Sequence, residues 1–226
     1  MTSGGTESIV LSMLAYRNWA RDEKGITEPN MYKIYIHPIS VIPETAHVAF
    51  IRACEYLVID CRKAAVHPDT QKANVKNMKK LIDSNTIALV ASAPSYGAGA
   101  FDPVEEIAAL AQRKNIGCHV DACLGGFIIA FRKDKLPKFD FSVEGTFKYN
   151  KYVGVTSLSC DHHKFGLSPK GASVVLFRTK ALRRKSIFAY SEWSGGLYTC
   201  TSMAGSRGAI GISGAWYAMV SIGRKR

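Results

Sequence analysis

The sequence predicts an α/β protein with a mostly parallel central sheet in a three-layer α/β/α sandwich. Stretches with helical periodicity alternate along the 226 residues with short apolar stretches typical of strands. Residues 86–93 are almost entirely apolar, as in a parallel strand covered on both faces. The composition, 47% hydrophobic and 21% charged residues, is that of a globular protein with a sizeable core. Disordered and collagen-like chains are thereby excluded.

The first half of the chain contains three predicted helices. Residues 8–23 carry apolar side chains at positions 9, 10, 13, 14 and 16, and Gly25 follows, which predicts an amphipathic helix that ends at a glycine. The other elements expected here are an apolar run at 40–42, a helix at 46–56, a strand at 57–59, a basic amphipathic helix at 74–83 and the strand at 86–93.

In the second half, Asp102 and Pro103 open a helix that runs to about residue 115, because proline suits the first helical turn. Strands are expected at 117–120, 155–159 and 173–177. Repeated strand–helix–strand units produce a parallel sheet, whose ligands bind outside the carboxyl ends of the strands. Residues at the ends of the predicted strands are therefore the first candidates for a functional site.

The net charge of +12 comes from 30 basic and 18 acidic residues, and it is local. Residues 132–185 contain 13 basic and four acidic side chains, and Arg224, Lys225 and Arg226 end the chain. A local excess of positive charge is compatible with nucleic acid, an anionic membrane or a phosphate-bearing substrate.

The six cysteines form no C-x-x-C pair and no signal peptide precedes them, so we expect a reduced, cytosol-facing compartment. The uncharged stretch 208–223 has 16 residues. A bilayer span needs about 20 apolar residues, so we expect none here.

The first motif is TSGGTES at residues 2–8, directly before the first helix. Glycines such as Gly5 let a ligand approach the backbone, the first helical turn offers free N–H groups, and hydroxyls such as that of Thr6 add donors. These features predict a phosphate-binding cradle. The alternative is an ordinary helix start capped by Ser3 or Thr6.

The second motif is GCHVDACLGG at residues 117–126, where Asp121 ends a predicted strand. Its carboxylate could face a cationic ring nitrogen in a crevice, or bond its own turn. Cys118, His119, Asp121 and Cys123 are also metal-ligand types, but strand alternation places 119 and 121 on the face opposite 118.

The third motif is SLSCDHHKFG at residues 157–166. Lys164 follows a strand among aromatic and imidazole neighbours, and desolvation with nearby cations would lower the pKa of its amine and favour a Schiff base. The alternatives are a solvated basic turn and a zinc site that uses the paired histidines. A phosphate cradle, an acid for a ring nitrogen and a lysine for an aldehyde are together the anchor points of pyridoxal 5′-phosphate.

With these motifs the chain resembles the fold-type I pyridoxal phosphate-dependent (group II) decarboxylases, and among them the sphingosine 1-phosphate lyase (sphinganine-1-phosphate aldolase) family. The matching segments are 2–9 (TSGGTESI), 44–50 (ETAHVAF), 119–127 (HVDACLGGF), 155–164 (VTSLSCDHHK), 168–171 (SPKG), 192–198 (EWSGGLY) and 204–207 (AGSR). The likeness covers most of the chain and implies the large, cofactor-binding domain of this fold type.

The resemblance implies a role for each matched residue. Lys164 would carry the Schiff base, Asp121 would pair with the pyridine nitrogen, His47 would stack on the ring and Cys123 would line the pocket.

For the phosphate groups, the resemblance implies that Gly5, Thr6 and His163 contact the cofactor phosphate. Lys170 would bind the substrate phosphate or assist proton transfer. No metal is expected.

The reaction implied is retro-aldol cleavage of a phosphorylated long-chain base to a fatty aldehyde and phosphoethanolamine. One alternative is an amino-acid decarboxylase of the same group. Others are a basic module that binds nucleic acid or anionic membranes through 132–185, and a zinc site; the zinc ligands would be Cys118, His119, Cys160 and His162.

Compared with this family, residues 1–226 are expected to be a cofactor domain truncated at both ends, without the small C-terminal domain and inactive alone. Two segments, 32–40 and 146–153, are expected to be insertions. This chain also departs from the family pattern at two places. It has Gly208-Ala209 where the family has Pro-Gly, and around 96–99 it lacks the family's Pro-His pair. The resemblance further implies a homodimer, and in eukaryotic full-length relatives a location at the endoplasmic reticulum membrane.

Overall fold

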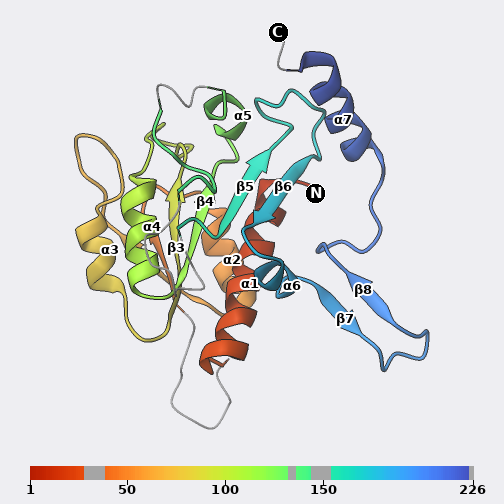
Figure 1. The fold of residues 1–226 in the computed structure, drawn as a ribbon, viewed down its shortest axis with the longest axis horizontal. Helices are drawn as coiled ribbons and strands as arrows, with labels where there is room; N and C mark the ends of the chain where they lie inside the picture. The colour runs from red at the N-terminus through yellow and green to blue at the C-terminus, as the bar shows by residue number, and fades with distance from the viewer. Residues whose placement is uncertain (28–38, 132–135, 144–153, 224–226) are drawn as a thin grey trace.

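The computed structural model describes residues 1–27, 39–131, 136–143 and 154–223, and its centre is a six-stranded sheet (Figure 1). The strand order is β2-β1-β3-β4-β5-β6. Neighbouring strands are parallel except β5 and β6, which are antiparallel. The strands are β1 (Ile39–Pro43), β2 (Asp60–Ala64), β3 (Thr86–Ser92), β4 (Gly117–Asp121), β5 (Ser157–Asp161) and β6 (Ser173–Phe177).

Helices cover both faces of this sheet, which confirms the predicted three-layer sandwich. α1 (Gly5–Lys24) and α2 (Ala49–Leu57) pack on one face, where Tyr16 and Phe50 are fully buried. α3 (Val75–Leu81) and α4 (Val104–Arg113) pack on the other. Parallel strands joined by such crossovers require both faces to be covered, which explains the apolar sequence of β3.

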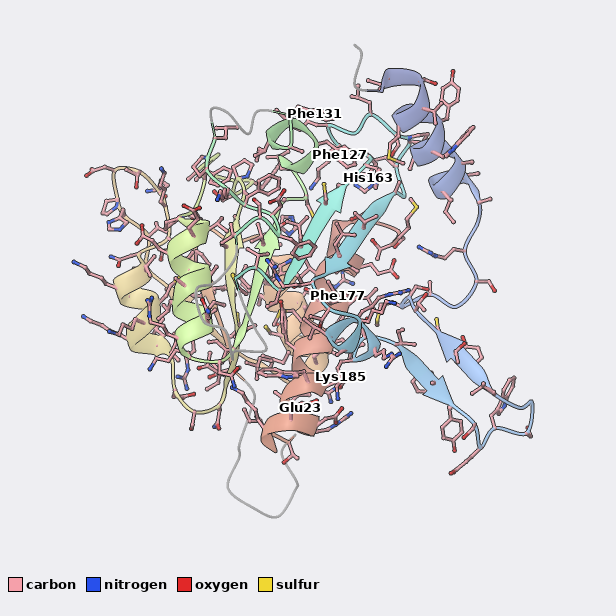
Figure 2. The ribbon with its side chains drawn as sticks, viewed as in Figure 1. Glu23, Phe127, Phe131, His163, Phe177 and Lys185 are labelled. Atoms are coloured by element: carbon pink, nitrogen blue, oxygen red, sulfur yellow. The ribbon has the colours of Figure 1, made fainter. Side chains whose placement is uncertain are left out.

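The end of α1 agrees with its sequence signal. Gly25 adopts a left-handed conformation with φ 66°, and its N–H donates to the carbonyl of Ala20. A left-handed residue after the last turn is a usual helix end, and glycine adopts it without strain. At this end of the helix, the Nζ of Lys185 lies 2.7 Å from Asp22 and 3.8 Å from Glu23 (Figure 2).

The strand predicted at 57–59 is wrong. Leu57 is the last residue of α2, and Val58 ends the helix in a left-handed conformation with φ 54°. The strand is instead β2, at the edge of the sheet and partly exposed. An edge strand does not need a continuous apolar sequence, so periodicity did not reveal it.

The two segments expected to be insertions lie largely outside the described residues. This holds for 146–153 and for 32–38. The last two residues of the first segment, Ile39 and Ser40, are buried in β1 and pair with both β2 and β3.

Several elements have no counterpart among the predicted ones. α5 (Gly126–Ile129) follows β4, and α6 (Lys180–Arg184) follows β6. A two-stranded hairpin, β7 (Phe188–Tyr190) with β8 (Tyr198–Cys200), and α7 (Ile210–Ile222) lie outside the sandwich (Figure 1). In the part of the chain that the structure describes, no helix is both long and apolar enough to cross a membrane.

Candidate functional site

A cavity of about 400 Å³ opens where β3, β4 and β5 end and α1 begins. Seven residues predicted for the site line it: Gly5, Thr6, His47, Asp121, Cys123, His163 and Lys164. The site is therefore at the carboxyl ends of the parallel strands, where ligands of such sheets bind. Lys170, also predicted, is exposed and does not line this cavity.

The start of α1 forms one wall of the cavity. No side chain caps this helix, so neither Ser3 nor Thr6 fills the role that the alternative interpretation gave them. Ser3 instead donates its backbone N–H and its hydroxyl to Glu7, at 2.7 and 2.6 Å. The N–H groups of an uncapped first turn can bind a phosphate.

The segment before α1 is fixed to the sheet. Thr2 pairs with Ser173 of β6 through two backbone hydrogen bonds, Thr2 N–H to Ser173 O at 2.8 Å and Ser173 N–H to Thr2 O at 3.1 Å. The buried hydroxyl of Ser8 lies 2.6 Å from that of Thr2 and 2.8 Å from that of Ser173. The cradle is thus held in place by β6, far away in the sequence.

Position 5 requires a glycine because the side chains of Asp161 and Cys123 lie close to its backbone. A Cβ at this position would lie 2.9 Å from both the Oδ2 of Asp161 and the Sγ of Cys123. Real Cβ contacts are longer, so a side chain here would displace atoms of the site.

Asp121, the last residue of β4, brings its carboxylate to the cavity wall. Its Oδ1 accepts hydrogen bonds from the backbone N–H of Cys123 at 3.0 Å and from the hydroxyl of Ser159 at 3.3 Å. The bond to its own turn and the position in the crevice, which the sequence offered as alternatives, are both present.

Lys164 lies in the turn after β5, and its Nζ is 2.9 Å from the Oδ2 of Asp161. Burial lowers the pKa of Lys164, but the hydrogen bond and charge of Asp161, with smaller contributions from Cys123 and Asp121, outweigh burial and raise it. The expected lowering of this pKa is therefore wrong, because the nearest charge is a carboxylate and not a cation.

Asp161 itself was missed by the sequence analysis, although it belongs to the DHHK motif. It is 1% exposed, and its Oδ1 has no hydrogen-bond partner among the described residues. A buried carboxylate oxygen without a partner costs folding free energy. This cost indicates that Asp161 serves the site more than it serves stability.

His163 completes the Asp161 cluster. Its Nδ1 accepts the backbone N–H of Ala172 at 3.1 Å, and its Nε2 lies 3.5 Å from the Oδ2 of Asp161. Burial lowers the pKa of His163, the charge of Asp161 opposes this, and Lys170 and Lys164 lower it further. Figure 2 shows His163 near the end of β5, on the same side of the molecule as Phe127.

His47 and Tyr96 also line the cavity. The Nδ1 of His47 accepts the N–H of Ala49 at 3.1 Å, which fixes the ring at the start of α2. Tyr96 lies edge-on to it, with ring centroids 6.4 Å apart. The resemblance marked 96–99 as a departure from the family pattern but gave Tyr96 itself no role; the turn after β3 brings it to the cavity.

The zinc interpretation is not supported. The described residues contain no group of three or more potential ligands placed to hold a metal ion. Both ring nitrogens of His119 are hydrogen-bonded, Nδ1 to Ser157 at 2.7 Å and Nε2 to Ser159 at 3.2 Å. His162 packs against Phe127, with ring centroids 4.6 Å apart.

The residues present fit pyridoxal 5′-phosphate. One cavity combines an uncapped helix start with a glycine at the point of closest approach, a carboxylate at a strand end, an imidazole on one wall and a primary amine. These groups match the phosphate, the ring nitrogen, the ring face and the aldehyde of that cofactor.

Comparison with curated proteins agrees with this fit. The chain is 44% identical over 226 residues to the sphingosine-1-phosphate lyase of Oryza sativa. The match covers 99% of this chain and 38% of the relative. It is 42% identical to that of Drosophila melanogaster, again over 99% of this chain and 38% of the relative. The chain thus spans less than half the length of these relatives.

Solved structures give the same result for the fold. The sphingosine-1-phosphate lyase of Burkholderia pseudomallei matches with a TM-score of 0.88 and 36% identity, over 99% of this chain and 48% of that one. A Lactobacillus brevis glutamate decarboxylase matches with a TM-score of 0.80 and 26% identity, over 98% and 49%.

The model of the pyridoxal-dependent decarboxylase conserved domain matches residues 1–190, most of the chain. The site described above lies within that stretch. The chain belongs to the pyridoxal-dependent decarboxylase family.

Proposed function

We propose that this chain provides the cofactor-binding part of a pyridoxal phosphate-dependent carbon–carbon lyase that cleaves phosphorylated sphingoid bases to a long-chain aldehyde and phosphoethanolamine. The observation that carries the proposal is the single cavity that joins the start of α1, Asp121 and Lys164. The relatives named above support the substrate class, since three of them are sphingosine-1-phosphate lyases.

Each wall of the cavity has a distinct task in this proposal. The N–H groups at Gly5 and Thr6 bind the cofactor phosphate, and His163 contributes to that site. Asp121 pairs with the ring nitrogen, and His47 lies against the ring. When bound, the cofactor supplies a ring that accepts the electrons released as the carbon–carbon bond breaks.

Lys164 would hold the cofactor through its primary amine. Asp161 holds its Nζ at 2.9 Å and keeps it charged. An amine must lose a proton before it attacks an aldehyde, and Asp161 and His163 are the neighbouring groups able to accept one. Lys170 is proposed to act on the substrate phosphate from outside the cavity.

The first experiment tests the cofactor. Pyridoxal 5′-phosphate added to the purified chain should produce a visible absorption band, and borohydride should fix the group to Lys164, as read by peptide mass spectrometry. Lys164→Ala should abolish both signals. The exposed Lys180→Ala is the matched control and should keep them; no band on the unmodified chain contradicts the assignment.

The second experiment tests the substrate class. A phosphorylated sphingoid base should change the absorption of the bound cofactor, whereas free glutamate should leave it unchanged. The reverse result would favour the amino-acid decarboxylase, the alternative within the same family. No observation on the structure favours the nucleic-acid or membrane module, and the homodimer and the endoplasmic reticulum location stay predictions of the resemblance.

A further inference from the structure

A chain of buried polar side chains connects the middle of α1 with the carboxylate of Asp121. The phenol of Tyr16 contacts the hydroxyl of Ser157. Ser157 contacts the Nδ1 of His119 at 2.7 Å, and the Nε2 of His119 contacts the hydroxyl of Ser159 at 3.2 Å. Ser159 then donates to the Oδ1 of Asp121 at 3.3 Å. The first four residues are fully buried.

The direction of each hydrogen bond follows from the chemistry of its ends. Because a carboxylate only accepts, the hydroxyl of Ser159 donates to Asp121 and must accept the Nε2–H of His119. A neutral imidazole has a single N–H, so its Nδ1 accepts the hydroxyl hydrogen of Ser157. Ser157 in turn accepts from Tyr16, whose hydroxyl also lies 2.8 Å from the Oγ1 of Thr156. From Tyr16 to Ser159, each donor therefore points toward Asp121.

The surroundings of His119 favour the neutral ring that this direction requires. Burial lowers the pKa of His119 to about 4, although the charge of Asp121 acts in the opposite direction. The ring of Phe50 meets His119 edge-on, with centroids 5.6 Å apart. Gly117 leaves the space that the Tyr16 ring fills, since a Cβ there would lie 2.1 Å from its Cε1.

Stability alone does not account for this arrangement. Apolar side chains of similar shape fill a core about as well as hydrogen-bonded polar ones, and buried polar groups are costly wherever one bond fails. The bonds also end on a carboxylate that lines the cavity. Aligned hydrogen bonds polarise one another, so the acceptor at the end receives a stronger bond than one hydroxyl alone would give.

We propose that Tyr16, Ser157, His119 and Ser159 are positioning residues that orient the carboxylate of Asp121 and strengthen its pairing with the cofactor's ring nitrogen. None of them lines the cavity, so they reach the site through Asp121, which does. This inference rests on the cofactor named in the proposed function, and it concerns residues to which the resemblance gave no role.

Ser159→Ala is the decisive variant, because it removes the donor that contacts Asp121. A hydrogen bond to a charged group contributes enough that we expect the dissociation constant of pyridoxal 5′-phosphate to rise roughly tenfold. We also expect the visible band to shift in wavelength or in its dependence on pH. Ser159→Thr keeps the hydroxyl and should restore most of the affinity.

Tyr16→Phe tests the far end of the chain. It deletes one hydroxyl, keeps the ring in the core and leaves the cavity untouched. A smaller rise in the dissociation constant, about two- to threefold, is expected, because only the polarisation of the last bond changes.

Ser12→Ala is the matched control. Ser12 is also a fully buried hydroxyl of α1, but it bonds the carbonyl of Ile9 at 2.7 Å and has no place in the chain of bonds. Its variant should bind the cofactor like the unmodified protein. Urea unfolding of all variants measures any loss of stability separately from the loss of affinity.

The outcomes separate this inference from the proposed function. The inference is supported if Ser159→Ala loses the most affinity for the cofactor, Tyr16→Phe loses less and Ser12→Ala loses none. Equal affinity in Ser159→Ala and the unmodified protein overturns it while the cofactor assignment stands. If Ser159→Ala does not fold, Tyr16→Phe decides by the same measurement; absence of cofactor binding in the unmodified protein refutes both proposals.

Discussion

The sandwich and the C-terminal arm, residues 188–223, differ in which side chains they bury and which they expose. In the sandwich, the buried side chains include polar ones: Asp161, which lines the cavity, and His119 and Ser159, which lie behind it. In the arm, large apolar groups are exposed: Phe188 is 58% exposed and Trp216 61%. In the sandwich, side chains are therefore buried to build the functional site as well as the hydrophobic core. The apolar residues of the arm, by contrast, contribute little to the fold described here.

The contact between α7 and the sandwich shows why the arm differs. α7 is apolar on all sides, but only Ala215 and Ala218 are buried. Its glycines provide the contact: a Cβ at Gly214 would lie 2.7 Å from the Cδ of Pro169, and one at Gly211 would lie 2.4 Å from the carbonyl of Gly171. Small residues face the sandwich and large ones face away from it.

The largest difference in stability is expected between Phe50→Ala and Trp216→Ala. Phe50 is fully buried under His119, so its truncation leaves a cavity and should lower the free energy of unfolding by about 4 kcal/mol. Trp216→Ala removes a mostly exposed ring and should change it by less than about 0.5 kcal/mol. Urea unfolding measures both, and equal losses would contradict the distinction between sandwich and arm.

Acid should destabilise the sandwich through His119. Burial lowers its pKa from an ordinary value of about 6.5 to about 4, so between these pH values the unfolded chain binds a proton that the folded chain does not. The stability associated with His119 is fully present above about pH 6.5 and falls by roughly 3 kcal/mol toward pH 4. Urea unfolding across this range should show a steeper loss for the unmodified protein than for His119→Gln; parallel curves would disprove it.

Gly5→Ala should affect the site more than the fold. The added Cβ would meet Asp161 and Cys123 at 2.9 Å, so we expect a cost of about 1–2 kcal/mol in unfolding free energy. The affinity for pyridoxal 5′-phosphate should fall at least tenfold, as measured by titration of the visible band. Gly97→Ala, where a Cβ would meet nothing within 4 Å, is the control and should change neither quantity.

A small effect, on stability alone, is expected at a helix cap on the sandwich surface. The side chain of Asn74 accepts the N–H of Asn77 at 3.0 Å at the start of α3. Asn74→Ala should cost about 1 kcal/mol, and Asn74→Asp, which keeps the acceptor, should cost less. Cofactor affinity should be unchanged in both variants. A change in affinity would show that α3 influences the site and would contradict the prediction.

The sequence predicted an element correctly where that element depends mainly on residues that are neighbours in the chain. The period of α1, its terminating Gly25 and the apolar sequence of β3 predicted those elements close to their observed bounds. The three motifs contain six of the seven predicted lining residues, and the seventh, His47, came from the family resemblance. Local signals failed for β2 and for the arm, where edge position and exposure depend on what packs alongside.

The sequence by itself determined the α/β class, the order of the motifs and the chemistry that Gly5, Asp121 and Lys164 can perform, because periodicity and residue type are local properties. Only the tertiary structure decided that Asp161 holds Lys164 and that Tyr16 is joined through His119 to Asp121. Tyr16 and Ser157 are 141 positions apart in the chain. Hydrogen bonds and charge interactions act over a few ångströms, so such partners are defined only once the sheet and α1 have packed together.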